Sequence, residues 1–210
     1  MTELFLTEKA LLSILKNDLV VSAKDAAQIL GKRSNVYRLE ESGLIAKVEP
    51  SGLGFFSLPD TDEDNAHYAI LAKYYQKCVV SGKTALLLYG LGEDYIDTID
   101  VDIPNTTNLE TSIFNIHRVA PKMFISIIKK SFEENGVSRE INIYTPERTL
   151  HEAYKYYGKG TDAFIRAIKR FRTLYLDQNR PGEQYDQILK INKKVGMIIV
   201  ELLRMGDVSE

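Results

Sequence analysis

Apolar residues in the first 60 positions recur at helical spacing and then fall in short extended runs. A first amphipathic helix is expected because four leucines share one helical face: Leu4, Leu11, Leu12 and Leu15. It is expected to end near Asn17. The segment VVSAKDAAQIL predicts a second helix. Ser22 and Asp25 stand at its start with the spacing of a capping box, in which a side-chain oxygen accepts a hydrogen bond from a free helix N–H.

A third helix is predicted directly after a glycine. Gly31 permits a tight turn, and Ser34 is expected to cap a helix over residues 35–42. The segments IAKVE (45–49) and FFSL (55–58) read as strands joined by the turn PSGLG, which predicts a hairpin. Helices with a glycine turn between the last two, followed by a hairpin, are typical of a winged helix-turn-helix domain. The alternative is a small helical packing module.

In a winged helix, the recognition helix lies in the major groove and only a few side chains on its outer face reach the bases. Arginine can bind guanine through two hydrogen bonds, and asparagine can bind adenine. Tyr37 can contact a phosphate, although an inward position in the core is an equal alternative. The predicted DNA-binding residues are Lys32, Arg33, Asn35, Tyr37 and Arg38.

Residues 60–65 are predicted to link a domain of residues 1–59 to a domain of residues 66–210. The segment LPDTDEDNAH combines a proline with closely spaced acids, which is typical of exposed connections. Beyond it, helical and strand patterns alternate. The expected strands are 78–82, 97–104, 111–119 and 138–145, and the expected helices are 67–76, 83–91, 121–132, 145–158, 162–175 and 183–204. The predicted fold class is α+β: an N-terminal winged helix-turn-helix followed by a mixed α/β domain with a helical C-terminus.

Composition adds an expectation about the compartment. Hydrophobic residues make up 44% of the chain, which suffices for a packed core, and charged residues make up 27%. The single cysteine, Cys78, cannot form an internal disulfide, which fits a reducing environment. No apolar run approaches the length of a membrane span, and the first residues do not form a basic signal-peptide start. We therefore expect a cytoplasmic protein with no membrane partner.

Four segments carry a resemblance to a known family: GFFSLP, VVSGKTALLLYGLGED, TIDVDIP and INIYTPERTLHEAYKYYG. Together they resemble the AbiEi-type antitoxins of type IV toxin–antitoxin systems, which act in abortive infection and phage defence. The resemblance covers nearly the whole chain, and its most specific part is YTPERTL (144–150), followed by a tyrosine-rich helix and a basic helix. Family members typically carry an aspartate shortly after this motif, where this chain has Glu152.

The resemblance implies a transcriptional repressor and antitoxin. Its N-terminal winged helix would repress its own operon by binding operator DNA at inverted repeats. Its C-terminal domain would counteract a nucleotidyltransferase-like toxin, without forming a stable complex with it. We expect no catalytic activity and no cofactor.

Three sequence patterns imitate catalytic motifs. SGKT (81–84) lacks the first glycine of a phosphate-binding loop, since Lys77 stands there, and HEAYK has Lys155 where a zinc-binding helix needs a second histidine. With three histidines and one cysteine, no metal site is expected. Asp100 and Asp102 alternate on a predicted strand, so both carboxylates face one side, as a nucleotidyltransferase needs to hold Mg²⁺. The Ser-Gly order and the long gap before Asp100 favour a solvated strand face instead.

The predicted helix 162–175 carries basic side chains within two turns, beside an apolar stripe that can be buried. A solvated face is one interpretation of this cluster. The other is binding to a phosphate backbone or an acidic partner, which the 11 basic and 8 acidic side chains of residues 151–210 favour. The cluster consists of Arg166, Lys169, Arg170 and Arg172.

The sequence therefore predicts an antitoxin that is also a DNA-binding autorepressor. Two other functions stay open. One is a nucleotidyltransferase-like enzyme that uses Asp100 and Asp102. The other is a winged-helix regulator whose second domain senses a small molecule.

Overall fold

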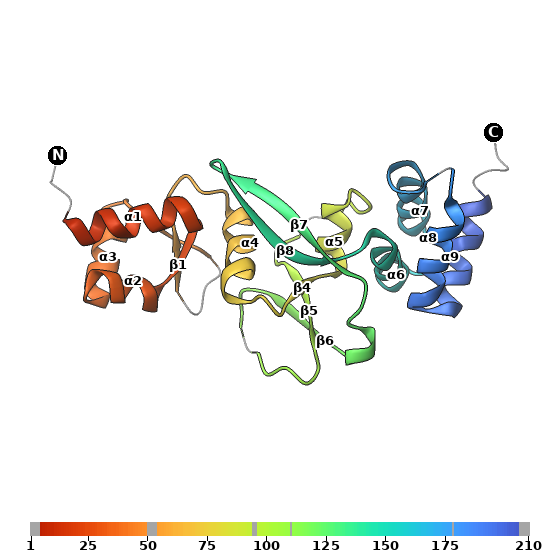
Figure 1. The fold of residues 1–210 in the computed structure, drawn as a ribbon, viewed down its shortest axis with the longest axis horizontal. Helices are drawn as coiled ribbons and strands as arrows, with labels where there is room; N and C mark the ends of the chain where they lie inside the picture. Colours follow the sequence, from red (N-terminus) through yellow and green to blue (C-terminus); the bar gives the residue numbers. More distant parts are fainter. Residues whose placement is uncertain (1–4, 50–53, 94–95, 110, 178, 206–210) are drawn as a thin grey trace. The chain divides into compact units, whose positions relative to one another are not determined.

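The computed structural model describes residues 5–49, 54–93, 96–109, 111–177 and 179–205 (Figure 1). The fold is mixed α+β with a helical C-terminus, as predicted. The chain divides into two compact units. Unit 1 comprises Met1–Gln76, Leu109–Ile113 and Lys130–Ile141, and unit 2 comprises Lys77–Asn108, Phe114–Lys129 and Asn142–Glu210.

Unit 1 starts with helices and a small antiparallel sheet. The helices are α1 (Leu6–Asp18), α2 (Ala23–Leu30) and α3 (Arg33–Glu41). The strands are β1 (Val20–Ser22), β2 (Ala46–Lys47) and β3 (Phe55–Ser57), paired in the order β1-β3-β2. Their shared core contains Leu11, Leu15, Val36, Leu39, Ile45 and Phe56. Most of the predicted hairpin turn, residues 50–53, lies outside the described residues.

Local side chains determine where these helices begin and end. Ser22 caps α2 as predicted, because its hydroxyl accepts the N–H of Asp25 at 3.1 Å. Gly31 follows α2 with φ +77°, a conformation that favours glycine. The predicted cap of α3 is wrong: Lys32 occupies the cap position with extended backbone, and Ser34 lies within the helix. Ser34 has the right chemistry for a cap, but the turn after Gly31 is short, so the helix already begins at Arg33, one residue before Ser34.

Helix α4 (Glu63–Tyr74) begins inside the predicted linker of residues 60–65, and Asp62 caps it. At its other end, the Tyr74 hydroxyl accepts the N–H of Ser22 at 3.0 Å and donates to Asp25 at 2.8 Å. The acidic segment is therefore the start of a helix packed within unit 1, and the boundary between units falls after Gln76.

Residues 121–132 do not form the predicted helix. Only Pro121–Met123 makes a short 3₁₀ turn, and the chain continues as β7 (Ile127–Glu134) and β8 (Val137–Tyr144). The isoleucines of this segment are β-branched and favour extended backbone. The far end of the hairpin packs in unit 1, where Phe132 contacts the ring of Tyr68.

The strands of unit 2 belong to a mixed sheet of order β6-β5-β4-β8-β7. Its first strands are β4 (Val79–Val80), β5 (Asp100–Pro104) and β6 (Asn115–Val119). Strand β5 runs antiparallel to β4 and parallel to β6, while β4 runs parallel to β8. Helix α5 (Gly82–Leu88) starts directly after β4, so its first residues lie beside the start of β5.

The C-terminal helices of unit 2 are gathered together (Figure 1). They are α6 (Pro146–Tyr157), α7 (Asp162–Leu174), α8 (Pro181–Ile191) and α9 (Lys193–Met205). Thr145 caps α6 as predicted. The predicted helix 183–204 is instead two helices, because Asn192 has extended backbone between them. None of the helices in the described ranges is long and apolar enough to cross a membrane.

Gly196 sets how closely α9 approaches α8. An added Cβ would lie 2.9 Å from the Ile188 carbonyl oxygen, so Gly196→Ala must push the two backbones apart. We expect it to lower the free energy of unfolding by about 1–3 kcal/mol. Gly182→Ala in α8 is the matched control, since nothing lies within 4 Å of its added Cβ. Urea denaturation of both variants makes the comparison, and an unchanged midpoint for Gly196→Ala would contradict this packing.

Candidate functional site

The predicted DNA-binding residues lie on or next to α3, but the structure does not leave all of them on one open face. Lys32 and Arg33 are exposed at the start of the helix. The Arg33 Nε donates to the Tyr37 hydroxyl at 3.1 Å, and its guanidinium lies over the Tyr37 ring. These side chains form a continuous exposed surface along the first turns of α3.

Arg38 has a partner that the sequence pattern did not predict. Its Nη2 donates to the carboxylate of Glu8, a residue of α1 whose side chain is only 5% exposed. The Arg38 side chain itself is 53% exposed. Because Glu8 holds one end of the guanidinium, only its remaining donors can serve a ligand.

The side chains of Asn35 and Tyr37 each make a contact within the chain and are also partly exposed. Asn35 is half-buried, and its amide donates to the Leu30 carbonyl at 2.9 Å, which stabilises the turn between α2 and α3. One N–H of the amide is thus used within the chain, and the contact to adenine stays a prediction. Tyr37 is 39% exposed and meets the ring of Phe56 edge-on, so it combines the two positions considered for it.

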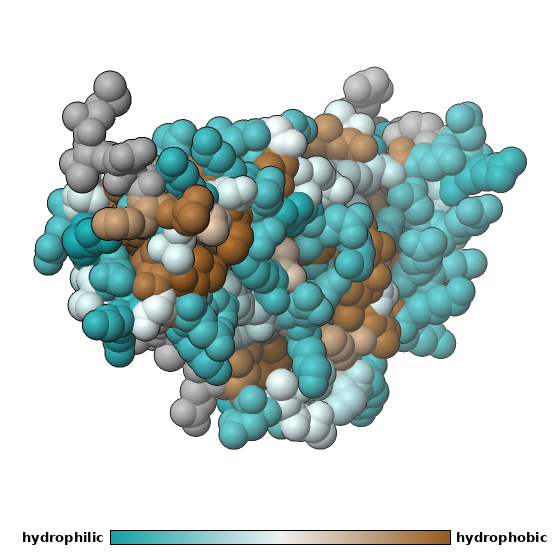
Figure 2. All heavy atoms as spheres, turned by 60° about the vertical axis from the view of Figure 1, so that its left-hand side comes forward, coloured by the Kyte–Doolittle hydropathy of each residue, from teal (hydrophilic) through white to brown (hydrophobic). Residues whose placement is uncertain are grey.

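Apolar side chains also reach the surface near the start of the chain. Phe5 and Leu6 are exposed, and the Arg38 guanidinium lies 6.0 Å from the Phe5 ring centre. Figure 2 shows apolar side chains gathered on the surface close to this end of the chain. The start of α1 and the exposed face of α3 are thus connected through Arg38.

In unit 2, Asp100 and Asp102 do not lie on a solvated strand face. Both carboxylates face the same side of β5, as the alternation predicts, but they are 6% and 2% exposed. The prediction of a solvated face is therefore wrong. The start of α5 and the end of β8 bring hydrogen-bond donors to them from sequence positions far away.

Each of the four carboxylate oxygens already accepts a hydrogen bond. Asp100 accepts from the Asn115 amide at 2.7 Å and from the Lys83 backbone N–H at 2.9 Å. Asp102 accepts from the Ser81 hydroxyl at 2.7 Å and from the Tyr144 hydroxyl at 2.9 Å. Such bonds compensate buried charge, which is otherwise costly. We call this arrangement the carboxylate cluster.

Gly82 and two further side chains complete the carboxylate cluster. His117 Nε2 lies 3.3 Å from Asp100 and 3.2 Å from the Tyr156 hydroxyl. Gly82 has φ +54°, and an added Cβ would lie 2.5 Å from an Asp100 oxygen. Gly82 is therefore required by close packing. Burial raises the pKa of Tyr144 and of Tyr156, and the neighbouring carboxylates raise both pKa values further.

Helix α6 adds a second group of buried polar side chains. Arg148 and Glu152 form an ion pair with 2.7 Å between Nη1 and Oε1, and both side chains are more than nine-tenths buried. His151 points its Nε2 at the Ile188 carbonyl. Burial lowers the pKa of His151 to about 4, so this imidazole is neutral at pH 7. The sequence motif YTPERTL indicated this helix but not its burial.

The predicted basic cluster lies on α7, and an acidic side chain divides it. Arg170 forms an ion pair with Glu93, and the Arg166 Nε lies 3.8 Å from the same carboxylate. Lys169 is exposed, and Arg172 is half-buried. The exposed positive surface is therefore smaller than the surface that all four predicted residues would form.

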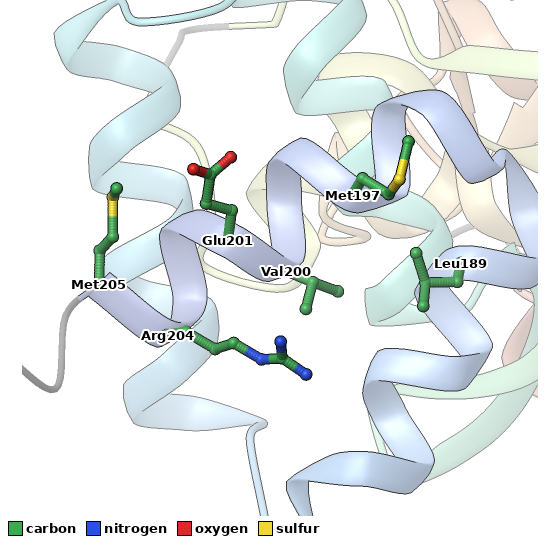
Figure 3. A pocket seen from close by; sticks show the side chains of 6 residues that line it. All are labelled: Leu189, Met197, Val200, Glu201, Arg204 and Met205. Atoms are coloured by element: carbon green, nitrogen blue, oxygen red, sulfur yellow. The ribbon is translucent and has the colours of Figure 1, made fainter.

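A groove that no sequence pattern indicated runs beside α8 and α9. Its volume is about 400 Å³, and it is lined by one stripe of α9 together with Leu189 of α8 (Figure 3). Met197 and Met205 of this stripe are more than half exposed. Spaced at helical intervals, these methionines are equally compatible with a core stripe, so the sequence alone could not place them on the surface.

No protein-family model and no curated protein sequence matches this chain. Among solved structures, the Rv2827c protein from Mycobacterium tuberculosis is similar in fold, with a TM-score of 0.52. The two sequences are 14% identical, and the similarity covers 97% of this chain and 83% of that protein. At this identity the similarity concerns the fold alone.

The carboxylate cluster predicts a measurable contribution to stability. Tyr144→Phe removes the donor to Asp102 without changing the ring, and we expect the free energy of unfolding to fall by about 1–3 kcal/mol because a buried carboxylate loses a partner. Tyr154→Phe is the control, since its hydroxyl makes no hydrogen bond to a described residue. Equal stability of the two variants in thermal unfolding would show that the Tyr144 bond contributes nothing.

Proposed function

We propose that unit 1 binds DNA as a winged helix-turn-helix domain and that the protein represses transcription. The observation that carries the proposal is the chain order α1-β1-α2-α3-β2-β3 with a three-stranded antiparallel sheet. In this arrangement α3 is the recognition helix, and the segment between β2 and β3 is the wing.

The exposed chemistry of α3 supports this proposal. Lys32 and Arg33 are positive and exposed at the start of the helix, where recognition helices contact base edges. Tyr37 fixes the orientation of Arg33 through a hydrogen bond, which reduces the conformational freedom that binding would otherwise cost. We assign base contact to Arg33, phosphate contact to Lys32 and Tyr37, and an ancillary contact to Arg38, which Glu8 already holds.

We further propose that the protein is a cytoplasmic antitoxin, on the resemblance to AbiEi-type antitoxins. Two features of unit 2 agree with the motif that carries the resemblance. YTPERTL forms the end of β8 and the capped start of α6, and a basic helix, α7, follows it. The Glu152 that replaces the family's aspartate is buried against Arg148, so an acid at this position has a structural partner.

We do not propose catalysis by Asp100 and Asp102. A nucleotidyltransferase needs carboxylate oxygens that are open to metal-bound nucleotide. Here every carboxylate oxygen of the pair accepts a hydrogen bond from its own chain.

The DNA-binding proposal predicts different effects for two neighbouring residues. Arg33→Ala should weaken binding to the DNA upstream of the gene by about 1–3 kcal/mol, because a bidentate base contact is lost. Lys32→Ala should weaken specific and random duplexes alike and reduce the salt dependence by about one phosphate contact. Fluorescence anisotropy over a range of salt concentrations measures both.

The exposed Lys9 provides the control for this experiment, because Lys9→Ala removes one positive charge from α1 and none from α3. If Arg33→Ala and Lys9→Ala bind the specific duplex equally well, α3 is not the recognition helix.

The antitoxin proposal predicts that protection depends on the exposed part of α7. Arg166→Glu combined with Lys169→Glu should abolish protection against a co-expressed nucleotidyltransferase-like toxin from the neighbouring gene while leaving DNA binding unchanged. Lys190→Glu combined with Lys194→Glu changes the net charge equally on other exposed positions and should keep protection. Growth under toxin induction is the measurement. A neighbouring gene of a different class, or full protection by the α7 variant, would contradict the proposal.

A further inference from the structure

Helix α6 buries several polar side chains, and one of their donors has no partner among the described residues. Glu147, Arg148, His151 and Glu152 are all at least nine-tenths buried, although charged side chains are rarely buried without partners. Arg148 and Glu152 pair with one another, but the Arg148 Nε has no hydrogen-bond acceptor among the described residues. A buried donor without an acceptor is uncommon in folded proteins and needs an explanation.

Arg148, His151 and Glu152 line a pocket within unit 2. Its volume is about 320 Å³, within the range of small-molecule sites. The charged residues in its lining are Asp102, Arg148, Glu152 and Lys155, and the apolar residues are Val119, Ala120, Met123, Ile191 and Val195. The pocket therefore combines a strongly polar part with an apolar part.

The charges of the pocket are balanced in sign. Arg148 and Lys155 offer donors to an anionic group, and the Lys155 Nζ is 3.8 Å from Glu152, too far for a strong hydrogen bond. Glu152 offers an acceptor to a cationic group, because its Oε2 is the oxygen that lies 3.8 Å from the Lys155 Nζ, whereas both oxygens of Asp102 already accept hydrogen bonds from Ser81 and Tyr144. A ligand with only one charge would meet both attraction and repulsion here, whereas a ligand with both charges meets a partner for each.

We propose that this pocket binds a small zwitterion, namely a free amino acid with an aliphatic side chain. Its carboxylate contacts Arg148 and Lys155, its ammonium group contacts Glu152, and its side chain packs on the apolar lining. The site is separate from the DNA-binding surface of α3, so the proposal does not depend on DNA binding. It gives a ligand class to a pocket that the carboxylate cluster borders through Asp102.

The test compares a ligand with versions that each lack one feature. Isothermal titration of the full chain with L-leucine is set against 4-methylpentanoate, which lacks the amine, and 3-methylbutylamine, which lacks the carboxylate. We expect each deletion to weaken binding at least about tenfold, the effect of losing a charged hydrogen bond. In the series glycine, L-alanine, L-valine, L-leucine, affinity should rise about fourfold for each buried methylene.

Two variants locate the site. Lys155→Met keeps the aliphatic stem and should weaken L-leucine about tenfold without weakening 3-methylbutylamine, because that probe has no carboxylate to lose a partner. Lys159→Met is the matched control, since Lys159 is exposed and outside the pocket lining. Ala120→Phe fills the pocket without removing a charge, and its retained thermal unfolding temperature would show that lost binding is not lost folding.

Three outcomes overturn the proposal. The first is that none of these amino acids binds at millimolar concentrations. The second is that L-leucine binds no better than the two analogues that lack a charge. The third is that L-leucine binds to folded Ala120→Phe as it does to the natural chain.

Discussion

Two buried negative charges, on Asp100 and Asp102, are the constraint on which the organisation of unit 2 depends. A buried carboxylate is tolerated only where donors surround it, and the donors here come from the end of β4, the start of α5, strand β6 and the end of β8. The strands must therefore keep their register for the charges to stay compensated. Gly82 is part of the same requirement, because any side chain there would displace an Asp100 oxygen.

Features that depend on neighbouring residues could be predicted from the sequence. The caps of α2 and α6, the glycine after α2 and the shared face of Asp100 and Asp102 all follow from side chains a few positions apart, and the structure confirms them. The residues that pack against a strand face cannot be predicted in this way, because they come from distant parts of the sequence. Tyr144, which covers Asp102, is 42 residues away, so a solvated face and a buried one have the same local pattern.

The same distinction between neighbouring and distant residues applies to the predicted DNA-binding residues of α3. The exposure of Lys32 and Arg33 follows from their place at the start of the helix. The partner of Arg38 lies 30 residues earlier in α1, and no periodicity indicates it. The prediction of a helix over residues 121–132 is wrong for a related reason: the apolar residues of this segment fit a helical face as well as a strand. Pairing with β8, decided by residues beyond the segment, selects the strand.

The hairpin of β7 and β8 divides its residues between the two units. Lys130–Ile141 belongs to unit 1 with helices α1 to α4, whereas the two ends of the hairpin belong to unit 2. Glu134 in this hairpin accepts the Asn65 amide at 2.7 Å, and Arg139 pairs with Asp18. The N-terminal part of the chain is thus not a detachable module. If residues 1–76 alone were exchanged with those of a homologue, the new surface would have evolved against a different hairpin. Residues 1–76 and 130–141 are therefore expected to be inherited together.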